Sequence, residues 1–451
     1  MSAALDWLVI GAGFRGIVAA HLLARAGARV ALADAAREPG GVLRSIPWRG
    51  HALDFGCHLF GNESEETTAL LLDLLDGDVV PVPLRVASAT NGTVRHGTEL
   101  PDLGAWGRGT AAAIVLELLE VARAPGGEPA SLADWLVQRY GPTAAGLLGP
   151  MAAKLLATDP ALLDAAAAAS TPFRRVRVVD APQAELLKAH PLLDDRVAAD
   201  APDDPMRYYR PAARHFPHRA FYPRQGGMGA FSAAAARRLG AAGVTLALGA
   251  PLVRLALDGD GVTLVRDDAA PLRASRALWA ADLPLLATLL GVAMPAPAVH
   301  AVPMVLVYFD VDADAVGEVR YAHDFDATTP VFRASAPGSF GAGPTPDGRS
   351  YVCCELPCSV ASDPWRDPEG CVPAAWAAAV RLGVARGDRW HAHLARPVPA
   401  SYRVPTRAAA ALERALAARL AAAPRLLRTD AWAFSKRAML ADVRRVLDRA
   451  A

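Results

Sequence analysis

The residues best suited to chemistry lie near the N-terminus, where a glycine-rich run precedes an acidic residue. Gly11, Gly13 and Gly16 form a G-x-G-x-x-G run, and Asp34 lies eighteen positions after Gly16. Glycines at this spacing allow a tight turn, a close approach of backbone amides to a pyrophosphate, and close packing of a helix on a strand. An acid about twenty residues further on accepts hydrogen bonds from ribose hydroxyls and disfavours a 2′-phosphate. The pattern therefore predicts a dinucleotide-binding site.

The same stretch contains the elements that must position these residues. Residues 6–10 are apolar after the first and predict a short buried strand, and residues 29–33 predict a second one. Residues 17–27 predict a helix that ends at a glycine. The order is that of a Rossmann βαβ unit, whose helix N-terminus favours phosphate. Phe14 and Arg15, inside the glycine run, belong to the predicted cofactor site.

A second set of glycines distinguishes this chain from a simple NAD-binding unit. A G-G-x-x-R turn follows the acid, and a D-x-G-x-H-x-F segment comes after it. The residues that carry these two patterns are Gly40, Gly41, Arg44, Gly56, Cys57 and His58. Here the chain resembles the flavoprotein superfamily of amine oxidases, protoporphyrinogen oxidases, phytoene desaturases and UDP-galactopyranose mutases. The resemblance implies FAD as cofactor and places His58 by the isoalloxazine, where it tunes the flavin, shuttles a proton or makes a structural hydrogen bond.

Later segments extend the resemblance over nearly the whole length. Residues 221–229 contain a Y-P-x-x-G-G-x-G turn, which in the family leads back into the FAD domain. Val253 falls where the family lays a strand residue against the adenine. Arg333, in a T-P-x-x-R pattern, falls where the mutases place a substrate-diphosphate arginine, and Tyr402 becomes a substrate-side candidate. The alternatives are a surface ion pair for Arg333 and core packing for Tyr402.

The C-terminal segment both matches the family and departs from it. Arg428 matches a family arginine, and Trp432 and Phe434 keep an alternation of aromatic residues. Leu427 replaces a family glycine, and residues 436–438 replace an N/D-M-D-like turn that faces the flavin. A cation near flavin N1–C2=O could stabilise an anionic reduced flavin. The alternative is a segment that holds the ring less tightly.

Length and charge exclude several classes of protein. A chain of 451 residues suggests two or three domains with an ample core. The net charge is +1 and no more than two basic residues are consecutive, which argues against a nucleic-acid partner. The early first strand and the absence of a long apolar run predict a cytoplasmic protein without a membrane span. The five cysteines form no C-x-x-C pair, so no metal site is expected.

The predicted fold class is α/β, with a discontinuous Rossmann-like FAD-binding domain and an α+β substrate or cap domain. The FAD-binding domain is assigned to residues 1–84, 221–292 and 403–451, and the cap domain to residues 85–220 and 293–402. In the cap, helices at 109–123, 131–140 and 143–157 form an insertion. Strands at 302–311, 328–333 and 350–355 predict an antiparallel sheet.

Three functions agree with these patterns. The first is an FAD-dependent oxidoreductase of the protoporphyrinogen or amine oxidase type, in which a small-molecule substrate gives a hydride to flavin N5. The second is a mutase-like flavoenzyme that isomerises a nucleotide sugar or related metabolite, with Arg333, Tyr402 and Arg174 on the substrate. The third is a catalytically inactive relative. Arginine-rich residues 171–175 and 207–219 suggest an anionic substrate or a solvated loop, and a homodimer is considered as the assembly.

Overall fold

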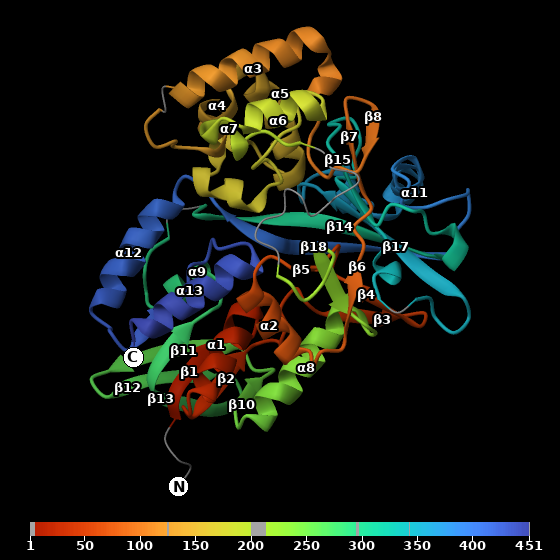
Figure 1. Cartoon of the computed structure of the whole chain (residues 1–451). Helices are drawn as coiled ribbons and strands as arrows, with labels where there is room; N and C mark the ends of the chain where they lie inside the picture. Colours follow the sequence, from red (N-terminus) through yellow and green to blue (C-terminus); the bar gives the residue numbers. More distant parts are fainter. Residues whose placement is uncertain (1–4, 124–125, 200–212, 295–296, 342, 451) are drawn as a thin grey trace.

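A parallel sheet with helices on both faces forms one half of the molecule (Figure 1). The computed structural model describes residues 5–123, 126–199, 213–294, 297–341 and 343–450. The first sheet has the strand order β10-β2-β1-β13-β12-β11, and β19 pairs with β13. Its strands are β1 Leu5–Ile10, β2 Val30–Asp34, β10 Thr245–Leu248, β11 Leu252–Asp258, β12 Gly261–Arg266, β13 Ala269–Trp279 and β19 Leu426–Arg428.

Apolar strands that are buried on both faces explain this arrangement. One face packs against α1 (Phe14–Arg25), α8 (Gly227–Ala241) and α13 (Lys436–Asp448). The other face packs against α9 (Leu283–Leu289) and α12 (Ala409–Ala421). The strands β10, β2, β1, β13 and β19 run parallel, whereas β11 and β12 form an antiparallel hairpin. The predicted Rossmann-like architecture is therefore confirmed.

A second sheet lies between the first sheet and a group of helices (Figure 1). Its order is β18-β14-β17-β16-β15-β7-β8. The strands are β7 Val86–Thr90, β8 Thr93–His96, β14 Val299–Asp312, β15 Tyr321–Asp324, β16 Arg333–Ser335, β17 Arg349–Pro357 and β18 Ala392–Pro405. All neighbours are antiparallel except β7 and β15, which run parallel, as the long chain between them permits. The predicted antiparallel pairing is confirmed for β14, β16 and β17, and the β7–β15 pair makes the sheet as a whole mixed.

Helices cover both faces of this second sheet. On one face α11 (Val372–Arg381) packs against β14 and β17. On the other lie the helices of the predicted insertion, whose apolar residues share a core with Val302 and Phe332 of the sheet region. These helices are α3 Arg108–Arg123, α4 Leu132–Tyr140, α5 Pro142–Leu156, α6 Ala181–Lys188 and α7 Pro191–Asp194. The insertion is therefore a lid over the second sheet.

Short elements connect the two sheets. The hairpin of β3 (Ser45–Trp48) and β4 (His51–Asp54) lies close to α8. A small sheet joins β5 (Phe60–Gly61), β9 (Ala220–Pro223) and β6 (Val79–Val82). The remaining α-helices are α2 Glu65–Leu74, whose N-cap Ser64 accepts a bond from the Thr67 amide, and α10 Asp363–Arg366.

Three local predictions need correction. The strand expected at 328–333 is confined to Arg333–Ser335, because the residues before it form a turn. The segment 221–229, described from the sequence as a turn, already contains the start of α8 at Gly227. Strand β18 was not predicted, since its prolines argue against a strand; they are tolerated because β18 lies at the edge of its sheet.

Candidate functional site

Three glycines form the turn after β1, and two of them leave no room for a side chain. Gly11 has φ +105°, and a Cβ there would lie 2.7 Å from the backbone nitrogen of Ala281. A Cβ on Gly16 would lie 1.7 Å from the carbonyl oxygen of Gly11. A Cβ on Gly13 would meet nothing within 4 Å, and Gly13 lines a cavity. Gly11 and Gly16 therefore serve close packing, whereas Gly13 leaves space for a ligand at the N-terminus of α1.

Asp34 stabilises this turn from the end of β2. Its Oδ2 accepts a bond from the Ala12 amide at 2.6 Å, and its Oδ1 accepts one from the Ala36 amide at 2.8 Å. The carboxylate also lines the cavity. Each carboxylate oxygen has a second lone pair, so Asp34 can still accept bonds from hydroxyl groups of a ligand.

The second glycine pair lies against the first turn. Gly40 and Gly41 have φ values of +114° and +61°. A Cβ on Gly41 would lie 3.3 Å from Cα of Gly13, so a larger residue would crowd the turn. Arg44 Nε donates to the carbonyl oxygen of Gly41 at 2.7 Å. Arg44 therefore stabilises this loop through the Gly41 carbonyl and does not line the cavity.

One cavity of about 1490 Å³ continues from these turns to the cap helices. Ordinary small-molecule pockets measure roughly 300–1,000 Å³, so this space can hold a dinucleotide together with a substrate. The predicted site residues that line it are Gly11, Gly13, Phe14, Arg15, Asp34, Gly40, Gly41, Cys57, His58, Arg333 and Tyr402. The open face of Gly13, the acid at the end of β2 and the length of the cavity fit a cofactor such as FAD.

Val253 and Arg428, like Gly16, Arg44 and Gly56, lie outside the cavity wall. Val253 on β11 is 56% exposed, so its side chain points to solvent. Arg428 forms an ion pair with Glu413, which also accepts a bond from the indole of Trp432 at 3.0 Å. Arg15 lines the cavity, yet its guanidinium donates to the carbonyl oxygens of Ala431 and Ala433 at 3.0 and 2.5 Å. Arg15 therefore ties α1 to the segment before α13.

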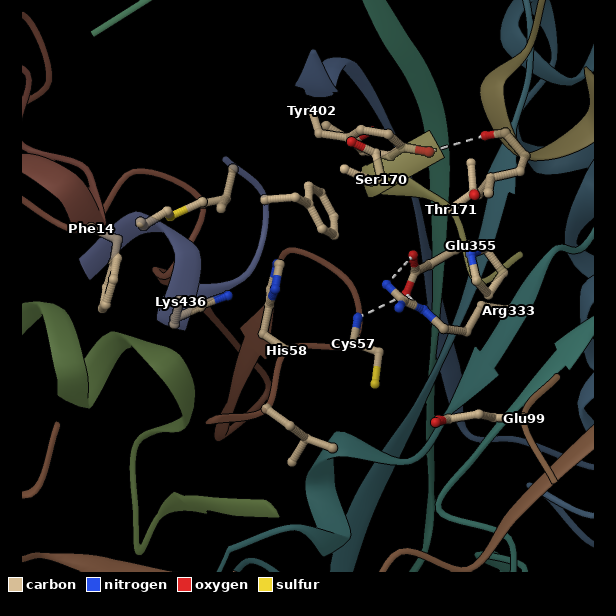
Figure 2. A pocket seen from close by; sticks show the side chains of 18 of the residues that line it. Phe14, Cys57, His58, Glu99, Ser170, Thr171, Arg333, Glu355, Tyr402 and Lys436 are labelled. Atoms are coloured by element: carbon tan, nitrogen blue, oxygen red, sulfur yellow. Dashed lines mark hydrogen bonds and ion pairs between the residues drawn. The ribbon is translucent and has the colours of Figure 1, made fainter. Parts of the chain in front are cut away.

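A buried ion pair lies at the inner end of the cavity (Figure 2). Glu355 on β17 is 3% exposed and lies opposite Arg333 of β16 in the strand register. Its two oxygens accept bonds from Arg333 Nε and a terminal nitrogen, both at 2.7 Å. Burial alone would lower the pKa of Arg333, but the charge of Glu355 outweighs burial and raises that pKa. Arg333 is therefore neutralised by a protein carboxylate.

Glu355 also holds the loop that carries Cys57 and His58. Its Oε1 accepts a bond from the Cys57 amide at 2.7 Å. A Cβ on Gly56 would lie 3.0 Å from the Glu355 carboxylate, so any larger residue at position 56 would displace that carboxylate. Glu355 was not identified from the sequence. The signal would have been a single acid in the otherwise apolar strand of β17 (Arg349–Pro357), across from an arginine.

His58 and Cys57 are both uncharged. His58 Nε2 lies 3.0 Å from the carbonyl oxygen of Phe55, so this nitrogen carries the hydrogen and Nδ1 can only accept. Burial, with the positive charges of Lys436 and Arg333, lowers the pKa of His58 to about 3. Burial raises the pKa of the Cys57 thiol to about 12. Neither side chain is a charged acid or nucleophile near neutral pH.

The substrate-side wall combines aromatic residues with a few polar groups. Tyr402 donates its hydroxyl hydrogen to the carbonyl oxygen of Leu155 at 3.2 Å, and its ring lies 6.1 Å from that of Phe434. Burial raises the pKa of Tyr402. Phe332 and Met304, which sequence reasoning missed, are buried and line the same space.

The cap side of the cavity carries basic residues. Arg174 and Arg175 line it beside Thr171, as the composition of residues 171–175 suggested. Arg174 is exposed, and its side chain makes no hydrogen bond or ion pair to the part of the chain that the structure describes. The predicted contribution of residues 207–210 lies outside the described residues.

Two searches of the described residues gave negative results. No helix in the described part of the chain is long and apolar enough to cross a membrane. Within the same residues, no group of three or more His, Cys, Asp or Glu side chains could hold a metal ion.

Comparisons with known proteins agree with this geometry. Residues 9–75 match the sequence family described as an NAD(P)-binding Rossmann-like domain. No curated protein sequence matches the chain.

Solved structures match the chain over its length. A reduced UDP-galactopyranose mutase has a TM-score of 0.70 at 14% identity, covering 99% of this chain and 95% of the mutase. A protein of an Exiguobacterium species assigned as a protoporphyrinogen oxidase has a TM-score of 0.68 at 15% identity, with 99% of both chains covered. A putrescine oxidase bound to putrescine has a TM-score of 0.63 at 16% identity, with 99% and 98% covered. The chain therefore has the whole-length fold of these mutase and oxidase structures, built on an N-terminal NAD(P)-binding Rossmann-like domain.

Proposed function

We propose that the protein is an FAD-dependent oxidoreductase that takes a hydride from a small-molecule substrate. The observation that carries the proposal is the continuous cavity, which joins a dinucleotide-binding turn to a pocket under the cap. When bound, FAD would supply a ring whose N5 accepts the hydride. The domain division at residues 1–84, 221–292 and 403–451 belongs to this proposal, with FAD bound by these segments and substrate by the rest.

The first turn would hold the phosphates. The amides around Gly13 and the N-terminus of α1 present hydrogen-bond donors and partial positive charge. The carboxylate of Asp34 would accept bonds from the ribose hydroxyls. Arg15 keeps the segment before α13 against α1 through its two carbonyl bonds, which fixes the wall beyond the phosphates.

The inner wall would position the substrate and exclude water. Hydride transfer needs a carbon held close to N5 and requires no charged base from the protein. The neutral His58, the paired Arg333 and the aromatic Phe332 and Tyr402 match this requirement. His58 Nδ1 would serve as a hydrogen-bond acceptor that fixes orientation.

The cap-side cations support an anionic substrate. Arg174 is a guanidinium without a protein partner in the described part of the chain, and Arg175 lies next to it in the cavity wall. Guanidinium groups bind carboxylate and phosphate oxygens in a bidentate manner. A substrate with a carboxylate or phosphate at one end and an oxidisable C–H at the other fits this distribution.

A mutase-like reaction is the second candidate, favoured by the fold shared with the reduced mutase. It would need arginines free to hold a diphosphate. The bidentate pair with Glu355 occupies Arg333, so Arg333 is a poor diphosphate ligand, which leaves Arg174 alone of the two arginines expected to hold the diphosphate. This contact makes the oxidoreductase the better supported reaction.

Spectroscopy of the purified protein separates the candidates. The proposal expects bound FAD whose visible absorbance bleaches when a substrate is added without another reductant. Turnover that appears only after reduction by dithionite would replace it with the mutase reaction. A folded protein that takes up no flavin would identify the third alternative, an inactive relative.

A further inference from the structure

Lys436 is a cation without a counterion on the cavity wall. It is the first residue of α13, whose cap Ser435 accepts a bond from the Ala438 amide at 3.1 Å. In Figure 2 its ammonium extends from α13 toward His58. Within the described residues, the ammonium forms no hydrogen bond and no ion pair. An amine in such a wall is stabilised by whatever anion enters the cavity.

The other cations at this end of the cavity are neutralised by the protein. Arg333 pairs with Glu355 at 2.7 Å, and Arg403 pairs with Asp282 at 3.3 Å. His58 is neutral, as its lowered pKa indicates. Burial lowers the pKa of Lys436, and Glu63 opposes that effect from beyond ion-pair distance. In the described part of the chain Lys436 therefore has no direct ion pair, and the Glu63 carboxylate on the same wall acts on its charge only from a distance.

The position of Lys436 along the cavity indicates which ligand group it meets. Asp34 marks the ribose end and Gly13 the phosphate turn. Phe14, the next residue, lines the cavity together with Lys436. Arg15 holds the segment before α13 against α1, and Gly13, His58 and Lys436 line the same cavity. A flavin ring attached to those phosphates would extend toward Lys436 and His58.

We propose that Lys436 balances the negative charge that the flavin ring gains on reduction, and thereby makes the bound cofactor a stronger oxidant. This inference rests on the proposed function. A hydride carries two electrons and one proton, so its transfer oxidises the substrate and leaves the ring with one extra negative charge. A fixed ammonium stabilises that charge more than it stabilises the neutral oxidised ring. The N-terminus of α13 adds partial positive charge of the same sign.

The test is the midpoint potential of bound FAD in the full-length protein, measured by equilibration with redox dyes. Lys436→Met should shift the reduction equilibrium roughly ten- to a hundredfold toward the oxidised form, about 30–60 mV lower. Lys436→Arg, which keeps the charge, should stay close to the wild type. Arg437→Met is the matched control, because Arg437 is the exposed neighbour that does not line the cavity.

Three results would overturn the inference. Equal potentials for Lys436→Met and the wild type would show that the ammonium does not act on the ring. Unchanged potential with weaker binding of benzoate, followed by flavin absorbance, would assign the charge to an anionic substrate instead. An equally lowered midpoint potential in Arg437→Met would show that any nearby positive charge, and not the Lys436 ammonium in particular, sets the potential of the flavin. A folded wild type that binds no FAD would refute the proposed function itself, which separates that failure from the other three.

Discussion

Removing the charge of Glu355 should destabilise the protein far more than removing an ordinary surface charge. Glu355→Gln leaves the Arg333 guanidinium facing an amide and weakens the bond to the Cys57 amide. The Glu355 and Arg333 side chains are 4% and 26% exposed. Loss of one partner from a fully buried pair costs about 3–5 kcal/mol. Because Arg333 keeps some contact with solvent, we expect a loss of about 2–4 kcal/mol in the free energy of unfolding.

Urea unfolding followed by circular dichroism measures this loss. Glu413→Gln is the control, since Glu413 pairs with Arg428 with side chains 24% and 21% exposed. It should cost about 1 kcal/mol, because partly exposed pairs contribute little. The double variant Glu355→Leu/Arg333→Met removes both charges and should recover most of the stability. A loss below about 1 kcal/mol for Glu355→Gln, or a double variant no better than the single one, would refute the reasoning.

Three further predictions follow from single sites. Gly13→Ala should abolish FAD binding while the circular dichroism spectrum stays unchanged, because the added Cβ would enter the open cavity and contact no protein atom. The control is Gly109→Ala, whose Cβ is equally free of contacts and which should bind FAD normally. Equal FAD affinities of the two variants would contradict the role of Gly13. Asp54 is fully buried with a pKa of about 6, against 3.8 for the free carboxyl, so the folded state binds the extra proton. The contribution of Asp54 to the free energy of unfolding should therefore fall by about 2–3 kcal/mol as pH rises from about 4 to 6. In Asp54→Asn the midpoint urea concentration should depend less on pH across that range. Because the pKa of His58 is lowered to about 3, His58→Gln should leave the pH–rate profile between about 5 and 8 unaltered. The same variant should change the flavin spectrum or the turnover rate. A changed pH–rate profile would show that His58 titrates in that range.

The first half of the site could be predicted because its chemistry is local. The spacing of Gly11, Gly13 and Gly16 fixes a strand, a turn and a helix within a few residues of one another. Their conformations follow from backbone geometry, and the structure shows the close contacts that exclude side chains at Gly11 and Gly16. The turn at Gly40 and Gly41 could be predicted for the same reason, because both residues have a positive φ that favours glycine.

The second half depends on strand register, which a single sequence does not reveal. Arg333 and Glu355 meet because β16 and β17 align in one particular register. A shift by one residue would turn both side chains to the opposite face. Val253, which the resemblance places against adenine, is exposed on β11, and its role stays a prediction. Strand β18 could not be predicted because its prolines argue against a strand, and the sequence does not show that β18 lies at the edge of its sheet, where prolines are tolerated.

The most direct test of the account is the flavin content of the protein. Full-length chain purified with added FAD, then freed of unbound cofactor, should show the visible absorbance of oxidised flavin at about one FAD per chain. Gly13→Ala, purified in the same way, should be colourless at an unchanged circular dichroism spectrum. A folded wild type without flavin absorbance, or a Gly13→Ala variant with the same FAD content, would contradict the claim that this turn and cavity bind the cofactor.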